Sequence, residues 1–401
     1  MTSENKEYLI REAFRRFYPS FLEAHPHLDY DKQNVAESIM RCKTGELGYN
    51  IAVCEECGTP QIHSVSCNNR CCPCCQAPLE EKWALERNTE LIEGIAYYHV
   101  VFTMPHELNK LIKANMVPLL SLLFKAVQST IMTLCADKKY MGAKPGLISV
   151  LHTWGQQMYF HPHIHVCLSG GGVTSENQFI ETRHKGFLIP EKVLATMFRG
   201  KYMSELKALY NSGSLNLNTM PELRNRYSWK EFINLLYSKN WIPFVKETFN
   251  GRGNAIQYLA RYSFRTAISN SRIVSVDDKT VTFRYKDYQD EGKTKVKTVD
   301  GQQFVGLFLQ HVLPKGFNRM RYSGFLTNCN KARQLKLIHK LRNTVYNGNP
   351  YRSMKIAELL NLLYKVEICA CPLCNGRLSF LPRGKPINNL PPHILSTSAV
   401  C

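Results

Sequence analysis

The chain lacks an apolar run long enough to span a bilayer, and no signal-peptide pattern opens it. Both absences argue against a membrane-spanning or secreted protein, so we expect a cytoplasmic one. In the reducing cytoplasm, its 15 cysteines are expected to be metal ligands rather than disulfide partners. The sequence also lacks internal repeats and is short of acidic residues.

The chain has 32 Asp and Glu residues against 51 Lys and Arg residues, which gives a net charge of +19. Such an excess predicts a polyanionic partner, and the lack of a membrane signal favours nucleic acid over a membrane surface. A length of 401 residues, 44% of them hydrophobic, predicts two or three domains with their own cores.

Alternating and helical apolar patterns are interleaved along the chain. Strands are expected over 97–103, 147–154, 158–168 and 242–248, with a hairpin over 272–288. Helices are expected over 7–40, 78–91, 108–136, 190–210, 229–237, 302–313 and 330–342. This order predicts an α+β fold with a mainly antiparallel sheet.

Histidine recurs at every second position in one of the expected strands. His161, His163 and His165 share one face, whereas the apolar residues between and after them would face the core. A row of imidazoles on a rigid strand can hold a metal ion. The alternative is a surface strand that is merely rich in histidine.

Two tyrosines lie one helical turn apart in a run without proline. Tyr258 and Tyr262 would share a helix face, with Arg261 and Arg265 beside them. The arginines suit a face that meets phosphate. The alternative is a tyrosine pair that packs on a core.

The His-hydrophobic-His triplet at 163–165, the Tyr-x3-Tyr pair and a Cys-rich N-terminal region occur together in this chain. From about residue 41 to 377, the chain resembles the two-tyrosine HUH transposases of bacterial insertion sequences. The resemblance implies a ferredoxin-like or RRM-like catalytic core. It also implies an enzyme that nicks and rejoins single-stranded DNA through 5′-phosphotyrosine links, during rolling-circle transposition.

The resemblance also implies roles for individual residues. Tyr258 and Tyr262 would be the nucleophiles, and His163 and His165 would bind Mg²⁺ or Mn²⁺, although two imidazoles alone suit zinc as well. Gln156 is the expected third ligand, with His161 and Gln157 as alternatives.

The DNA partner would be single-stranded DNA and the hairpins at element ends. Its phosphates would meet Arg261, Arg265 and Lys246, and the enzyme would associate with the nucleoid when it acts.

Two C-x2-C pairs in the N-terminal region have the separation of a zinc ribbon. Their four cysteines form the first expected zinc site: Cys54, Cys57, Cys72 and Cys75. A second set could form another: Cys42, His63, Cys67 and Cys71. Basic residues around the cluster suit DNA binding, although a module that only stabilises the fold explains the cysteines equally well.

A third C-x2-C pair lies near the end of the chain, at Cys371 and Cys374. It would need Cys369 and an unknown fourth partner to close a metal site. The alternative is a tight turn with free thiols.

Three consecutive domains are expected along the chain. Residues 1–92 would hold an N-terminal helix and the zinc-binding domain, and 93–300 the catalytic domain with a helical insertion at 173–240. Residues 301–401 would form a helical region with a cysteine knuckle and an irregular tail. Three other functions stay open: a replication initiator or relaxase, a zinc-dependent nucleic-acid-binding protein without catalysis, and a zinc hydrolase using the three histidines.

Overall fold

The computed structural model describes residues 8–182, 189–248, 266–365, 367 and 369–381. The chain divides into two compact units, each discontinuous in sequence. We call 83–263 with 313–349 the central unit, and 1–82 with 264–312 and 350–401 the terminal unit. This division differs from the three consecutive domains expected from the sequence, because residues 264–312 join the N-terminal helices.

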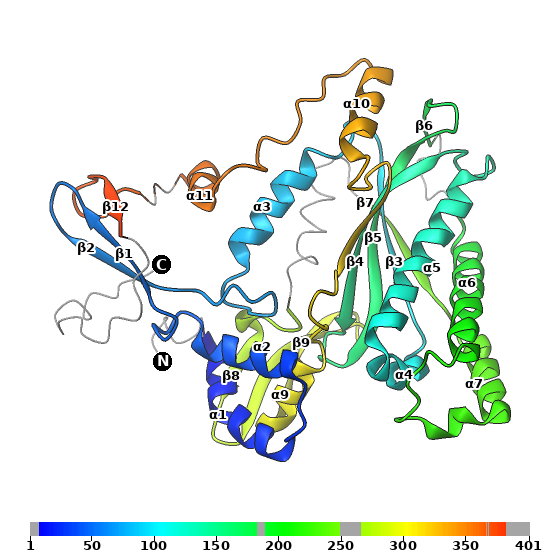
Figure 1. Cartoon of the computed structure of the whole chain (residues 1–401), viewed down its shortest axis with the longest axis horizontal. Helices are drawn as coiled ribbons and strands as arrows, with labels where there is room; N and C mark the ends of the chain where they lie inside the picture. The colour runs from blue at the N-terminus through cyan, green and yellow to red at the C-terminus, as the bar shows by residue number, and fades with distance from the viewer. Residues whose placement is uncertain (1–7, 183–188, 249–265, 366, 368, 382–401) are drawn as a thin grey trace. The chain divides into compact units, whose positions relative to one another are not determined.

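A six-stranded antiparallel sheet forms the middle of the central unit (Figure 1). Five strands follow the order β11-β4-β5-β3-β7, and β6 pairs with β5. Their bounds are Tyr97–Thr103 (β3), Lys144–Trp154 (β4), Phe160–Val173 (β5), Phe179–Glu181 (β6), Pro243–Thr248 (β7) and Met320–Gly324 (β11). The α+β class and the antiparallel sheet expected from the sequence are confirmed.

Four helices form a layer over one face of this sheet; three of them contact its strands, and α7 joins the same hydrophobic core (Figure 1). They are α4 (Asn109–Ala114), α5 (Met116–Ala136), α6 (Glu191–Asn211) and α7 (Arg226–Ser238). The alternate strand residues Tyr98, Val100 and Phe102 of β3 point into this layer and are fully buried. Side chains at the intervening positions therefore lie on the opposite face of the sheet.

Contrary to the expectation from the sequence, helix α5 is long and apolar enough to cross a membrane, and it is the one such helix among the described residues. Its apolar stretch is 61% buried within the protein. Leu119, Leu123 and Val127 belong to the core that α5 shares with the sheet. These contacts are those of a core helix.

The terminal unit contains two three-stranded sheets, with strand orders β10-β9-β8 and β12-β1-β2. The strands of the first are Ile273–Val276 (β8), Thr280–Asp287 (β9) and Lys293–Asp300 (β10). Those of the second are Tyr49–Cys54 (β1), Pro60–Ser64 (β2) and Leu378–Phe380 (β12). The helices of the unit are α1 (Leu9–Ala24), α2 (Tyr30–Arg41), α9 (Gly301–Leu309) and α11 (Ile356–Tyr364), with the first residues of α3 (Ala77–Asn88).

Helix α9 crosses α1 closely enough to require a glycine. The rings of Phe14 and Phe308 meet edge to face with centroids 5.1 Å apart. A Cβ atom on Gly301 would lie 2.2 Å from the ring of Phe17. The helix contact thus joins the segment at 264–312 to the N-terminal helices.

Several element boundaries differ from the expected ones. The helix expected over 7–40 is two helices, because residues 25–28 leave the helical path and Asp29 caps α2 through its side chain. The helix expected over 108–136 breaks at Asn115. Strands β10 and β11 and helix α11 were not expected; each has fewer than ten residues. Helix α10 (Lys331–Leu341) was expected.

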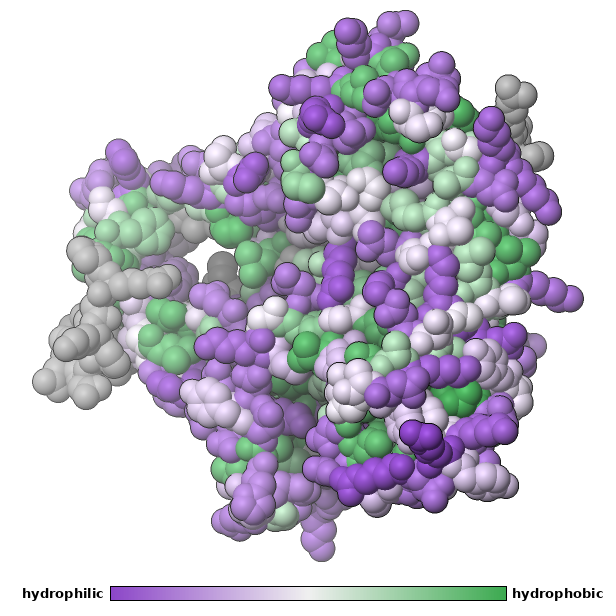
Figure 2. Space-filling view, turned by 45° about the vertical axis from the view of Figure 1, so that its right-hand side comes forward, coloured by the Kyte–Doolittle hydropathy of each residue, from purple (hydrophilic) through white to green (hydrophobic). Residues whose placement is uncertain are grey.

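Hydrophilic side chains cover much of the face drawn in Figure 2, with smaller apolar patches between them. Exposed large apolar side chains belong to several separate elements, such as Tyr227 on α7 and Val296 on β10. Together with the net charge of +19, this surface suits a polyanionic partner.

Candidate metal centres

The β4–β5 hairpin brings three histidines together on the sheet face opposite α4–α7. His152 of β4 lies directly opposite His163 of β5, and His165 follows two residues later on the same face. One ring nitrogen from each residue lies within 4.8 Å of the other two. The backbone register of two long strands therefore fixes the spacing of the three imidazoles.

Neighbouring groups orient two of these rings. The Nδ1 atom of His163 lies 2.7 Å from the carbonyl oxygen of His161, and donates to it. The Nδ1 atom of His165 lies 2.9 Å from Nε2 of His99, and the two rings stack at 7°. Both contacts leave Nε2 as the nitrogen that would ligate a metal ion, the usual arrangement around metal-bound histidine.

The site is largely shielded from water. His152 and His165 are only 3% and 6% exposed. Burial lowers the pKa of His163 to about 4. Its ring is therefore neutral near pH 7 and keeps the lone pair that metal binding needs. The ring of His152 also stacks on Trp154, with centroids 4.4 Å apart.

The other residues expected at this site occupy different places. Gln156 and Gln157 lie in the short connection between β4 and β5, next to the histidines in sequence. His161 is half-buried, and its carbonyl oxygen accepts the hydrogen bond from His163. The β4–β5 register shifts next to it, beside Pro162. Gln156 stays a prediction as a metal ligand.

Both predicted nucleophiles, Tyr258 and Tyr262, lie outside the described residues, as do Arg261 and Arg265. Of Lys246 only the backbone is described, opposite His99 in the β3–β7 ladder. Their roles stay predictions.

Sequence reasoning missed His152 and His99 at this site. His152 could have been found from the sequence, since pairing the strands expected over 147–154 and 158–168 as a hairpin places it near the histidine row. His99 gave no comparable signal, because β3 is far from β5 in sequence.

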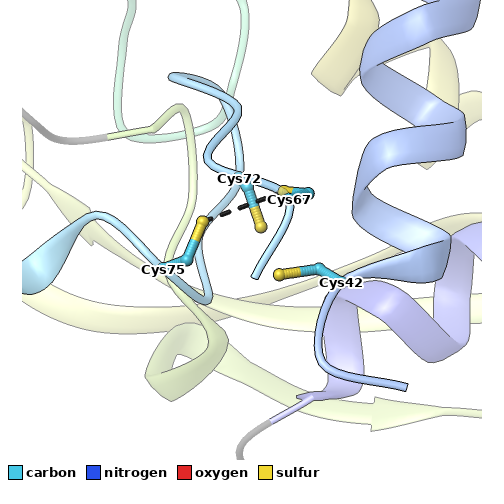
Figure 3. Close-up of side chains that lie close together, drawn as sticks. All are labelled: Cys42, Cys67, Cys72 and Cys75. Carbon is cyan, nitrogen blue, oxygen red and sulfur yellow. Dashed lines mark hydrogen bonds between the residues drawn. The ribbon is translucent and has the colours of Figure 1, made fainter. Parts of the chain in front are cut away.

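Four cysteines converge in the terminal unit: Cys42, Cys67, Cys72 and Cys75 (Figure 3). Cys42 caps the end of α2, and the other three come from the irregular segment before α3. Their sulfur atoms lie within 4.8 Å of one another, and Cys42 and Cys72 have no exposed surface. Four converging thiols are the donor set of a tetrahedral structural zinc site.

Hydrogen bonds connect the thiols of this cluster and favour the thiolate form of Cys42. The backbone N–H of Asn69 donates to Cys67 Sγ at 3.5 Å, and the backbone N–H of Cys74 donates to Cys72 Sγ at 3.5 Å. Hydrogen bonds from the thiols of Cys67 and Cys72 hold the pKa of Cys42 far below its usual value. A thiolate is the form that binds zinc.

The structure groups the cysteines differently from either set expected from the sequence. Cys72 and Cys75 join Cys42 and Cys67, whereas Cys54 and Cys57 lie with Cys371 and Cys374. His63 lies on β2 with an exposed side chain, and Cys71 is outside the cluster, whereas its neighbour Cys72 is a buried member of it. Local spacing defines each C-x2-C pair but not which pairs meet.

The chain matches two family models. Residues 13–104 match the family described as "Transposase zinc-binding domain", a range that contains the Cys42 cluster. Residues 146–333 match the family described as "Putative transposase", a range that contains His152, His163 and His165.

Two curated proteins are similar over most of their length. The "Putative transposase y4qJ" of Sinorhizobium fredii is 35% identical over 356 residues, which covers 88% of this chain and 84% of that protein. The "Transposase for insertion sequence element IS801" of Pseudomonas savastanoi pv. phaseolicola is 25% identical over 350 residues, which covers 85% of this chain and 81% of that protein. No solved structure matches the chain.

Proposed function

The chain belongs to the insertion-sequence transposases that carry an N-terminal zinc-binding domain, and from this premise we propose that it nicks and rejoins single-stranded DNA through phosphotyrosine links. The observation that carries the proposal is the group formed by His152, His163 and His165. In a chain with a net charge of +19, such a group can face a phosphate backbone.

The donor set of this group fits a divalent transition ion. Three neutral imidazoles favour Mn²⁺ over Mg²⁺, since Mg²⁺ prefers oxygen ligands. The amide oxygen of Gln156 would add a hard ligand to the three nitrogens. A bound cation would supply charge stabilisation at a non-bridging oxygen of the scissile phosphate.

The tyrosines would carry out the covalent step. A tyrosine Oη attacks phosphorus and forms a P–O bond, while the bond from phosphorus to the 3′-oxygen breaks. The phenol proton is lost to solvent or a base, and the departing 3′-oxygen takes up a proton. One phosphodiester replaces another, so the reaction needs no ATP. Attack by a 3′-hydroxyl on the phosphotyrosine reverses the step and rejoins the strand.

Two nucleophiles would permit two covalent links at once. Tyr258 and Tyr262 could hold the donor strand and make the next cleavage, which is the logic of rolling-circle transposition. Arg261, Arg265 and Lys246 would contact the DNA phosphates. The reaction would take place in the cytoplasm, where the DNA of a bacterium lies, and its substrates would include the hairpins at element ends.

The test is covalent capture of DNA by the wild-type protein. Labelled single-stranded oligonucleotides from the flanks of its gene are incubated with the protein and Mn²⁺ or Mg²⁺, then resolved by denaturing electrophoresis. We expect a protein–DNA adduct that requires the metal and is lost with EDTA. An adduct that forms equally well in EDTA would contradict the metal role, and no adduct with any flank or hairpin would contradict the function.

Zinc in the family's N-terminal domain would be held by Cys42, Cys67, Cys72 and Cys75. We expect Cys72→Ser to lose this ion and to destabilise the surrounding module, because structural zinc can contribute on the order of 10 kcal/mol to folding. The matched control is Cys71→Ser, since Cys71 is adjacent in sequence but outside the cluster.

The zinc content and the melting temperature of the two full-length variants test this ligand set. The expected result is loss of one zinc ion and a lower melting temperature for Cys72→Ser alone. Equal zinc content in both variants would rule out this ligand set.

A further inference from the structure

A second group of four thiols joins two segments from opposite ends of the sequence. Cys54 and Cys57 come from the end of β1 and the turn that leads to β2, and Cys371 and Cys374 from the turn before β12. Their sulfur atoms lie within 4.8 Å of one another. The family model for the zinc-binding domain ends at residue 104 and so contains only the first pair.

The two cysteine turns have the same backbone geometry. In the first, the N–H of Gly58 donates to the carbonyl oxygen of Cys54 at 3.0 Å, and Gly58 has a φ of +70°. In the second, the N–H of Asn375 donates to the carbonyl oxygen of Cys371 at 2.9 Å, and Asn375 has a φ of +61°. Each turn therefore presents its two thiols in the same way.

Backbone hydrogen bonds hold the two turns next to each other. Strand β12 pairs antiparallel with β1, with Cys54 opposite Leu378. The backbone N–H of Glu55 donates to the carbonyl oxygen of Arg377 at 2.9 Å. A Cβ atom at Gly376 would lie only 3.0 Å from Cys54 Sγ, so the close approach of the two turns favours glycine at this position.

This small sheet has almost no core of its own. Its cluster of buried residues consists of Ala52, Cys54, Cys371 and Leu378, two of which are cysteines of the thiol group. So little apolar surface cannot hold three short strands together, and small domains of this kind depend on a metal or disulfides.

A disulfide explanation fits the structure poorly. The sulfur atoms of Cys54 and Cys374 are 3.4 Å apart, and those of Cys57 and Cys371 are 3.7 Å apart. Both distances far exceed the S–S bond length of about 2.05 Å. Four thiols on two tight turns instead match a tetrahedral site for one metal ion.

We propose that Cys54, Cys57, Cys371 and Cys374 bind a second structural Zn²⁺, which ties the β1–β2 hairpin to the C-terminal strand β12. The site is separate from the Cys42 cluster and from the histidines, so it does not depend on the proposed catalysis. The C-terminal knuckle thus completes a zinc ribbon whose first half lies about 300 residues earlier in the chain.

Cysteine alkylation of the full-length wild-type protein tests the proposal. Because no residue is substituted, misfolding of a variant cannot affect the result. Cys57, Cys374 and Cys369 are all exposed, so without a metal all three should react rapidly. We expect Cys57 and Cys374 to react slowly in the zinc-loaded protein, and to become as reactive as Cys369 once a chelator has removed the metal. Mass spectrometry of the separated peptides measures each cysteine.

Two results in this experiment would overturn the proposal. One is fast alkylation of Cys374 in the loaded protein, at the rate of Cys369. The other is protection that a reductant removes but a chelator does not, which would indicate a disulfide.

Metal content of matched variants gives a second measurement. We expect about two zinc ions per chain in the wild type, and one fewer when Cys371→Ser and Cys374→Ser are combined. Cys369→Ser, two residues away and outside the group, should keep both ions. Unchanged zinc in the double variant, or iron in place of the second zinc, would refute the assignment.

Discussion

Replacing both Tyr258 and Tyr262 with phenylalanine is expected to abolish the covalent protein–DNA adduct. Phenylalanine keeps the ring but lacks the oxygen that attacks phosphorus, so no phosphotyrosine can form. Each single variant should still form an adduct with the remaining tyrosine, whereas transposition should fall greatly in both, because the reaction would use two links. Denaturing electrophoresis measures the adduct, and a mating-out assay measures transposition.

The matched control for these variants is Tyr227→Phe. Tyr227 lies on α7 of the same unit and is 70% exposed. It should form the adduct at the wild-type level. A double variant of Tyr258 and Tyr262 that still captures DNA would remove both tyrosines from the mechanism.

Replacing His163 with alanine is expected to lower cleavage by at least about 100-fold, since even groups that only orient metal ligands contribute about 10- to 100-fold. Binding of single-stranded DNA should largely remain, because it depends on the basic surface. His152→Ala should show a loss of the same kind, which distinguishes the site seen in the structure from one built on His163, His165 and Gln156 alone. Initial cleavage rates at several Mn²⁺ concentrations measure the effect.

His106→Ala is the matched control, since the His106 side chain is 80% exposed and outside the histidine group. Its cleavage rate should equal that of the wild type. A wild-type cleavage rate in the His152 variant would mean that His152 packs against Trp154 and does not bind the metal. The same result in the His163 variant would eliminate the metal site.

Features that depend only on residues close together in the sequence could be predicted from the sequence alone. The strand at Tyr97–Thr103 was predicted with its observed bounds, because its alternation and the proline after it are local signals. Period-two spacing also predicted that His163 and His165 share one face, and both lie in the three-histidine group. The zinc-binding domain and the transposase family followed from ordered motifs, and the comparisons agree with both.

Tertiary structure decided which of these local pieces meet. Every C-x2-C turn presents two thiols in a similar way. The spacing within a turn therefore cannot predict that Cys54 and Cys57 meet Cys371 and Cys374 rather than Cys72 and Cys75. Likewise, His152 joins the histidine row only through the register of the β4–β5 hairpin. Pairing across long separations reflects the sum of many weak packing and hydrogen-bond energies over a whole unit, and no short stretch of sequence carries that sum.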